Sequence, residues 1–256
     1  MTRARRRTIA GLVLALVVLS VATDLQARPT APPTVLAASS LTTVFPLIDA
    51  APRYSFAGSD TLAAQIRLGA PADVLAAASS KIPDKLYAEG LVEKPAVFTT
   101  NKLVLVTPTS NPANITSVFD LRRPGIKLVV GAPTVPIGAY TRTILKNLRL
   151  TSVLSNIVSE ETDVRSILGK VTLGEADAGF VYATDAKTVA SKVHVIRLPA
   201  WAQPPVRYEI AVVKSTGNRA AAVAFVNRVL SKAGQAKLRA AGFGAVKHGV
   251  TRYVGG

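Results

Sequence analysis

Short apolar runs alternate with amphipathic segments along the chain from residue 34 onward, and this alternation constrains the fold more than any other feature. The apolar runs have the length of buried strands and lie at residues 34–37, 72–76, 102–107, 127–131, 178–182, 193–197 and 208–213. Helical patterns lie between and after them, at residues 42–50, 61–69, 141–148, 162–173 and 220–241. This order predicts an α/β fold with mainly parallel sheets. The 256 residues suffice for one large or two modest domains with real cores.

Two strand-like segments indicate where the chain passes between two lobes. Residues 99–106 and 206–213 both begin polar and become continuously apolar, and the second follows a proline-rich stretch. We expect them to be crossover strands. The first lobe would then comprise residues 34–103 and 207–256, with a C-terminal tail, and the second lobe residues 104–206.

The first 22 residues have the pattern of a signal peptide. Four arginines, Arg3, Arg5, Arg6 and Arg7, precede an apolar run at residues 9–22, and Ser20-Val21-Ala22 fits a cleavage site. The run is short for a membrane span, which needs about 20 residues, although an uncleaved anchor is the alternative. Residues 23–33 would be a linker. We therefore expect export, to the periplasm or to the outer face of the cytoplasmic membrane.

Charge and residue usage exclude several functions. The net charge of +16 would suit nucleic acid, but no basic run after the signal is longer than Arg122-Arg123 and aromatic residues do not alternate with the charges. We therefore expect no nucleic-acid partner. The absence of cysteine excludes disulfides, thiol catalysis, a thiolate zinc site and a lipid-modified N-terminal cysteine. With only His194 and His248, a histidine-rich metal site is also excluded.

Two hydroxyl-rich turns lie early in the chain, at residues 37–42 (AASSLT) and 56–62 (FAGSDTL). Each is expected to lead into a helix, whose N-terminus offers unpaired N–H groups and partial positive charge to an anion. Ser40 and Ser59 are the candidate contacts, and Ser39 is an additional one. The alternative is that these serines only cap their helices.

Two later turns have the same design, at residues 135–138 (VPIG) and 161–164 (ETDV). Pro136 lacks an N–H and Gly138 permits close backbone approach, which leaves the Ile137 amide available. Thr162 is expected to be the N-cap of the next helix, with the Val164 amide pointing outward.

Tyr182 ends a buried strand, where its hydroxyl can reach a polar cleft. The alternative for Tyr182 is a half-buried tyrosine bonded to a backbone carbonyl.

Six segments, in order, resemble the periplasmic molybdate-binding proteins of ABC transporters. They are residues 37–42, 56–66, 69–74, 135–140, 163–165 and 174–186. The resemblance extends over residues 34–245, and it implies a two-lobed type II periplasmic-binding-protein fold with a ligand cleft between the lobes. It further implies an exported binding protein that captures molybdate, and tungstate with it, for a membrane permease and its cytoplasmic ATPase. We expect a monomer, because nothing in the sequence suggests a surface for self-association.

The resemblance also implies which residues hold the anion. Ser40 and Ser59 would give hydroxyl and backbone donors, Ile137 and Val164 backbone N–H groups, and Tyr182 its phenolic hydroxyl. These groups would contact the oxygens of molybdate and would not be direct metal ligands, and no cofactor is implied. A cluster of neutral donors favours a fully deprotonated anion over hydrogen phosphate, with an affinity that is flat from about pH 6 to 9. Selection against sulfate would rest on cavity size.

Three other functions compete with this interpretation. The same fold would also suit sulfate, phosphate or a small organic anion. A ligand-sensing domain of a transcription regulator shares the fold type, but the export signal and the missing helix-turn-helix motif disfavour it. An enzyme is disfavoured because neither histidine has a motif around it and no nucleophile elbow, P-loop or dinucleotide fingerprint is present.

Overall fold

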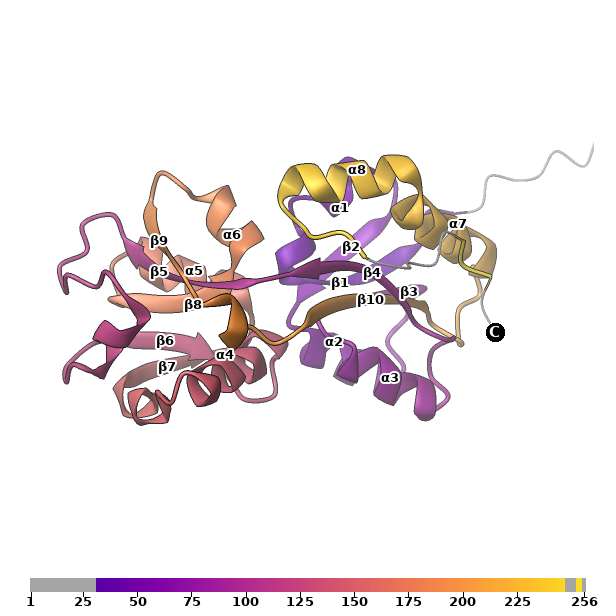
Figure 1. Ribbon diagram of the computed structural model, residues 1–256. Coiled ribbons are helices and arrows are strands. Elements are labelled where there is room, and N and C mark those ends of the chain that lie inside the picture. Colours follow the sequence, from indigo (N-terminus) through magenta and orange to yellow (C-terminus); the bar gives the residue numbers. More distant parts are fainter. Residues whose placement is uncertain (1–30, 247–251, 255–256) are drawn as a thin grey trace, which may run out of the picture.

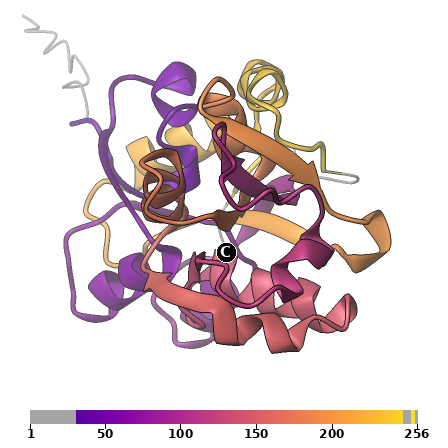
Figure 2. The same ribbon diagram turned by 90° about the vertical axis from the view of Figure 1, so that its left-hand side faces the viewer.

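The computed structural model describes residues 31–246 and 252–254, which form two α/β lobes lying end to end (Figure 1). Each lobe is built on one five-stranded sheet, with strand orders β2-β1-β3-β10-β4 and β7-β6-β8-β5-β9. Figure 2 views the molecule from the end of the second lobe, with the first lobe behind it. The predicted α/β, two-lobed fold class is confirmed.

The first lobe contains β1 (Thr34–Ala38), β2 (Arg53–Ala57), β3 (Val74–Ala77), β4 (Ala96–Asn101) and β10 (Val206–Val212). Its helices are η1 (Ser39–Leu41), α1 (Phe45–Ile48), α2 (Ser59–Arg67), α3 (Lys81–Ala88), α7 (Arg219–Leu230) and α8 (Lys232–Ala241). Helices α1, α7 and α8 lie on one face of the sheet, and α2 and α3 lie on the other (Figure 1).

The second lobe contains β5 (Leu103–Pro108), β6 (Leu128–Gly131), β7 (Ile157–Glu161), β8 (Ala178–Tyr182) and β9 (Val193–Arg197). Its helices are η2 (Val118–Arg122), α4 (Pro136–Asn147), η3 (Thr151–Asn156), α5 (Val164–Thr172), α6 (Ala183–Thr188) and η4 (Ala200–Ala202). The strand predictions at 178–182 and 193–197 match β8 and β9 residue for residue.

The prediction of mainly parallel sheets holds for four strands of each sheet and fails for the fifth. Four of the five strands run in one direction, but β10 is antiparallel to both β3 and β4, and β5 is antiparallel to both β8 and β9. The cause is the chain path. A strand that arrives from the other lobe enters the sheet in the reverse direction, whereas strands joined by helical crossovers stay parallel.

The two predicted crossover segments are strands that connect the lobes. Only Lys102 separates β4 of the first sheet from β5 of the second, and the chain returns through η4 into β10 (Figure 1). The residue-level lobe boundaries remain predictions. The predicted signal peptide lies outside the described residues, and so does most of the linker.

Two helix predictions need correction. The expected helix at 42–50 is the short α1 preceded by the turn η1. The expected helix at 220–241 is two helices that meet at Ser231, which has an extended backbone and caps α8 by accepting the Gly234 N–H at 3.1 Å. Because serine competes for backbone hydrogen bonds, it ends one helix and begins the next.

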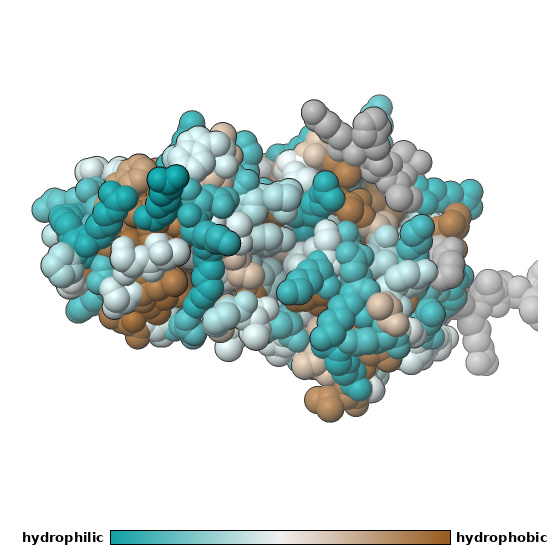
Figure 3. All heavy atoms as spheres, turned by 60° about the horizontal axis from the view of Figure 1, so that its bottom comes forward, coloured by the Kyte–Doolittle hydropathy of each residue, from teal (hydrophilic) through white to brown (hydrophobic). Residues whose placement is uncertain are grey.

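Aliphatic residues make up most of the buried core, and an aromatic cluster around Phe45, Phe98 and Phe225 fills the first lobe. Hydrophilic residues cover much of the face shown in Figure 3, with hydrophobic residues scattered between them. Among the described residues, no helix has the length and apolar character that crossing a bilayer requires.

Candidate functional site

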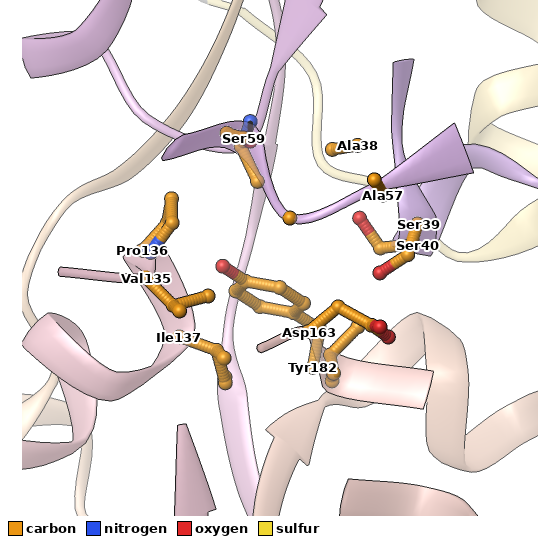
Figure 4. Close-up of a pocket in the computed structure, with 13 residues that line it drawn as sticks. Ala38, Ser39, Ser40, Ala57, Ser59, Val135, Pro136, Ile137, Asp163 and Tyr182 are labelled. Carbon is orange, nitrogen blue, oxygen red and sulfur yellow. Dashed lines mark hydrogen bonds between the residues drawn. The ribbon is translucent and has the colours of Figure 1, made fainter. Parts of the chain in front are cut away.

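A pocket lies between the lobes, where helices α2, α4 and α5 meet the ends of β1, β2, β3 and β8. Its empty space is about 210 Å³, part of which is open to solvent, and it is lined by Ala38, Ser39, Ser40, Ala57, Gly58, Ser59, Ala78, Val135, Pro136, Ile137, Asp163, Val164 and Tyr182. All five residues predicted to hold an anion are therefore in one place, together with the additional candidate Ser39. Figure 4 shows Ser39 and Ser40 on one side, Val135–Ile137 on the other, and Tyr182 between them.

Helices α2, α4 and α5 all begin at this pocket. Their first residues are Ser59, Pro136 and Val164, and neither Gly58 nor Val135 caps its helix with a side chain. Within the described residues, the amides of Ile137 and Val164 donate to no protein acceptor. Three helix ends with open N–H groups create a positive potential without any lysine or arginine in the lining.

The N-cap of α5 is Asp163, so the prediction that Thr162 caps this helix is wrong. One Asp163 carboxylate oxygen accepts the amides of Arg165 and Ser166 at 2.7 and 3.2 Å, and the other accepts the Ser166 hydroxyl at 3.0 Å. Aspartate caps as well as threonine, and the extended backbone of Asp163 sets the helix start one residue later. The Val164 amide stays uncapped, and the Asp163 carboxylate accepts from donors of its own helix.

Four hydroxyl groups line the pocket, those of Ser39, Ser40, Ser59 and Tyr182. Ser59 Oγ accepts the Ala78 amide at 3.0 Å, and Ser40 Oγ lies 2.9 Å from the Tyr208 hydroxyl. The Tyr182 hydroxyl is buried and has no hydrogen-bond partner in the described part of the chain. A buried hydroxyl without a partner costs free energy, which makes it a group arranged for a ligand.

Burial raises the pKa of Tyr182 well above the ordinary value for tyrosine. The neighbouring Tyr208, Tyr140 and Asp185 act in the same direction. Tyr182 therefore keeps its hydrogen at neutral pH and can only be a neutral partner of an anion.

The two lobes touch at the rim of the pocket. The hydroxyl of Thr134 in the second lobe donates to Asp60 of the first lobe at 3.0 Å. Gly58 lies so close to the Thr162 carbonyl oxygen that a Cβ atom there would overlap it. A second close approach surrounds Gly138, where a Cβ would overlap the carbonyls of Gly131 and Ala132. This confirms the expected tight backbone packing at the start of α4.

Three buried polar residues beside the pocket escaped the sequence analysis: Asn101, Asp185 and Tyr208. Asn101 ends the polar start of the first crossover, which we interpreted only as a boundary. Asp185 follows Tyr182 by three residues, inside the segment 174–186. Tyr208 lies between Arg207 and Glu209 near the start of the second crossover, and that polar start was interpreted only as a lobe boundary.

The described residues provide no set of side chains that could coordinate a metal ion in this pocket. Within residues 31–246 and 252–254, no group of three or more His, Asp or Glu side chains could hold a metal ion. The arrangement offers donors to the oxygens of an anion.

Comparisons with known proteins agree with this geometry. A family model described as a bacterial extracellular solute-binding protein matches residues 50–244. The molybdate-binding protein ModA of Mycobacterium tuberculosis H37Rv is 44% identical over 191 residues, covering 74% of this chain and 72% of the relative. ModA of Haemophilus influenzae is 36% identical over 174 residues, covering 64% and 68%.

Solved structures show the same fold. The periplasmic molybdate-binding protein of Azotobacter vinelandii superposes with a TM-score of 0.74 at 24% identity, covering 84% of this chain and all of that one. The sulfate-binding protein SubI of M. tuberculosis gives 0.70 at 18% identity, covering 85% and 88%.

The relatives bind solutes for transport, so the prediction that this protein is not an enzyme is confirmed by its family. Molybdate is a ligand of these relatives and not a cofactor. The chain belongs to the bacterial extracellular solute-binding proteins and, among them, to the molybdate-binding proteins of ABC transporters.

Proposed function

We propose that the interlobe pocket captures molybdate, and tungstate with it, through Ser40, Ser59, Ile137, Val164 and Tyr182. The observation that carries the proposal is the set of open donors. Two amides and the Tyr182 hydroxyl have no protein acceptor within the described residues, and all of them line one pocket. A tetrahedral dianion has four oxygens that need such donors when it leaves water.

Neutral donors explain why a deprotonated anion would be preferred. Helix N-termini and hydrogen bonds balance the charge of the anion. The proposed binding groups are donors, so they offer no acceptor for a proton on the ligand. Asp163, the one carboxylate in the lining, is held by three donors of its own helix. Hydrogen phosphate would leave its proton without an acceptor, which costs about 1–3 kcal/mol for one buried unpaired group.

The same proposal covers the cellular role. The protein is exported by its signal peptide, binds the anion as a monomer and closes by hinge motion of the crossover strands. The closed form delivers the anion to a membrane permease that works with a cytoplasmic ATPase. The contact between Gly58 and Thr162 supports closure as the state in which the ligand is held.

Replacement of both serines tests the site. Ser40→Ala with Ser59→Ala is expected to weaken molybdate binding by about 1–3 kcal/mol for each lost hydrogen bond, which is roughly 5- to 150-fold per serine. Isothermal titration calorimetry measures the change, and thermal unfolding verifies that the variant is folded. Ser155→Ala, which removes an exposed hydroxyl in η3, is the matched control. Unchanged affinity in the double variant would place the site elsewhere.

A further inference from the structure

A buried chain of hydrogen bonds extends from Ser40 to both crossover strands. Ser40 Oγ lies 2.9 Å from the Tyr208 hydroxyl of β10. The side-chain amide nitrogen of Asn101, at the end of β4, lies 3.4 Å from the same hydroxyl and 2.9 Å from Thr184 Oγ1 of α6. The chain therefore joins one wall of the pocket to the hinge and to the second lobe.

The direction of each hydrogen bond follows from one backbone amide. The Lys102 N–H can only donate, and it lies 2.9 Å from Asn101 Oδ1, so the oxygen of that side chain faces Lys102. The other end of the Asn101 side chain is then its NH₂ group, which has two hydrogens and accepts none. Tyr208 and Thr184 must both accept from Asn101.

Tyr208 has one hydrogen, and Ser40 is the acceptor for it. The hydroxyl of Tyr208 already accepts from Asn101, and the neighbouring Tyr182 hydroxyl forms no hydrogen bond in the described residues. The only remaining hydrogen bond of Tyr208 in the described residues is the one to Ser40. Either hydroxyl could donate by distance alone, but Ser40 is the one partner left for the Tyr208 hydrogen, which assigns Tyr208 as the donor. Ser40 accepts there, so its own hydrogen is directed elsewhere. Ser40 lines the interlobe pocket and also a second, mostly apolar pocket beside α8, and of these two only the interlobe pocket gathers the other open donors.

We infer that Tyr208 and Asn101 are positioning residues that fix Ser40 as a hydrogen-bond donor and so make this wall of the site select a fully deprotonated oxyanion. The inference rests on the proposed function. A serine hydroxyl that is free to rotate can donate to a deprotonated oxygen or accept from a protonated one. A serine that already accepts from Tyr208 is committed to donating into the pocket.

Burial keeps the Tyr208 hydroxyl protonated. It raises the pKa of Tyr208 well above its usual value, and Asp185 and Tyr140 act in the same direction. The ring is held in place as well, because it makes edge-to-face contacts with Phe98, Tyr182 and Phe243. Removing the hydroxyl while keeping the ring is therefore a specific perturbation.

Tyr208→Phe tests the inference through a double-mutant cycle with Ser40→Ala. If Tyr208 acts through Ser40, Tyr208→Phe should weaken molybdate binding about fivefold to tenfold in the wild-type background and by less than about twofold in the Ser40→Ala background. Competition by phosphate should improve relative to molybdate in the single Tyr208→Phe variant. Tyr54→Phe removes another partly buried hydroxyl, bonded to the Phe45 and Asp49 carbonyls away from the pocket, and should leave affinity and selectivity unchanged.

Each outcome decides between structural and positioning roles. An equal loss in both backgrounds, or no loss in either, would overturn the positioning role. A loss of affinity without a change in phosphate competition would also overturn it, because a merely structural effect weakens all anions alike. Failure of the wild-type protein to bind molybdate or tungstate would refute the proposed function as well, and the wild-type titration reveals this separately.

Discussion

Gly58 is the residue at which closure of the two lobes can be tested most sharply. It caps α2 in the first lobe, and an added methyl group would overlap the Thr162 carbonyl of the second lobe and lie 2.9 Å from Asp60 Oδ1. The clash partner on the second lobe is backbone, which cannot rotate away as a flexible side chain can. The backbone of Gly58, with φ of −60° and ψ of 140°, suits alanine, so the strain of Gly58→Ala comes from these two contacts. The flexible Asp60 side chain can move away, which leaves the contact between lobes as the main cost.

The magnitude follows from the overlap. To reach ordinary contact the lobes must separate locally by about 1 Å, and inserting a methyl group into a tight contact costs about 1–3 kcal/mol. Only the closed state bears this cost, so molybdate affinity should fall about 5- to 150-fold. We expect the free energy of unfolding of the ligand-free protein to change little, because the proposed opening of the lobes would make room for the methyl group.

Calorimetry with molybdate measures the affinity, and small-angle X-ray scattering with and without molybdate measures the compaction. Gly169→Ala is the matched control, because nothing lies within 4 Å of a Cβ on Gly169 in α5. That variant should bind as the wild type does and be stabilised by about 0.5–1 kcal/mol through helix propensity. Wild-type affinity and wild-type compaction in Gly58→Ala would refute closure at this contact.

The remaining predictions concern Asp185 and Ser231. Burial raises the pKa of Asp185 to about 7, with Asp163 acting in the same direction and Arg165 opposing it. Because this folded pKa lies above the unfolded value of 3.8, the native state holds the proton more tightly and the protein loses stability as pH rises from about 4 to about 7. Asp185→Asn should remove this loss of stability, which amounts to up to about 4 kcal/mol at pH 8. Denaturant unfolding of both proteins at pH 5 and pH 8 measures the loss. Equal pH dependence in the wild type and the variant would contradict the raised pKa of Asp185. A bound dianion near Tyr182 would raise the pKa of Asp185 further, so molybdate affinity should be higher at pH 6 than at pH 8. Each pH unit by which the dianion raises this pKa should increase the affinity about tenfold. In Asp185→Asn the affinity should not depend on pH. Calorimetry at both pH values would rule against this coupling if wild type and variant behaved alike. Ser231→Ala should cost about 1 kcal/mol because it removes the cap of α8, without affecting affinity, and a thermal unfolding temperature at or above that of the wild type would show that the cap is dispensable.

The pH dependence of molybdate affinity expected from the structure differs from the one expected from the sequence. A flat affinity from pH 6 to 9 follows if every carboxylate has an ordinary pKa. Asp185 departs from that assumption because it is 2% exposed and one of its oxygens has no partner within the described residues. Burial of a single side chain depends on the packing of α6 against distant strands, which no local pattern reveals.

Local patterns in the sequence selected residues that lie together in the fold. Each candidate donor belongs to a short segment whose structure is set by residues next to it in the sequence. These segments are the serine turns, the Val-Pro-Ile-Gly turn and the strand ending at Tyr182, and all of them line one pocket. The cap of α5 was misplaced by one residue because Thr162 and Asp163 are adjacent and both suit an N-cap.

Strands without a continuous apolar run were missed. β2 and β7 are only partly buried, and β4 contains two threonines and an asparagine, so none of them resembles the buried strands of the sheet centre. The antiparallel entry of β5 and β10 was missed for another reason. Strand direction depends on which lobe the chain comes from, and periodicity carries no such information.

The central claim is that the interlobe pocket selects a deprotonated tetrahedral anion of the size of molybdate. Isothermal titration of the ligand-free protein with molybdate, tungstate, sulfate and phosphate in turn tests it most directly. The account predicts tight one-to-one binding of molybdate and tungstate, with sulfate and phosphate far weaker. Absence of molybdate and tungstate binding, with binding of sulfate, phosphate or an organic acid in their place, would contradict it.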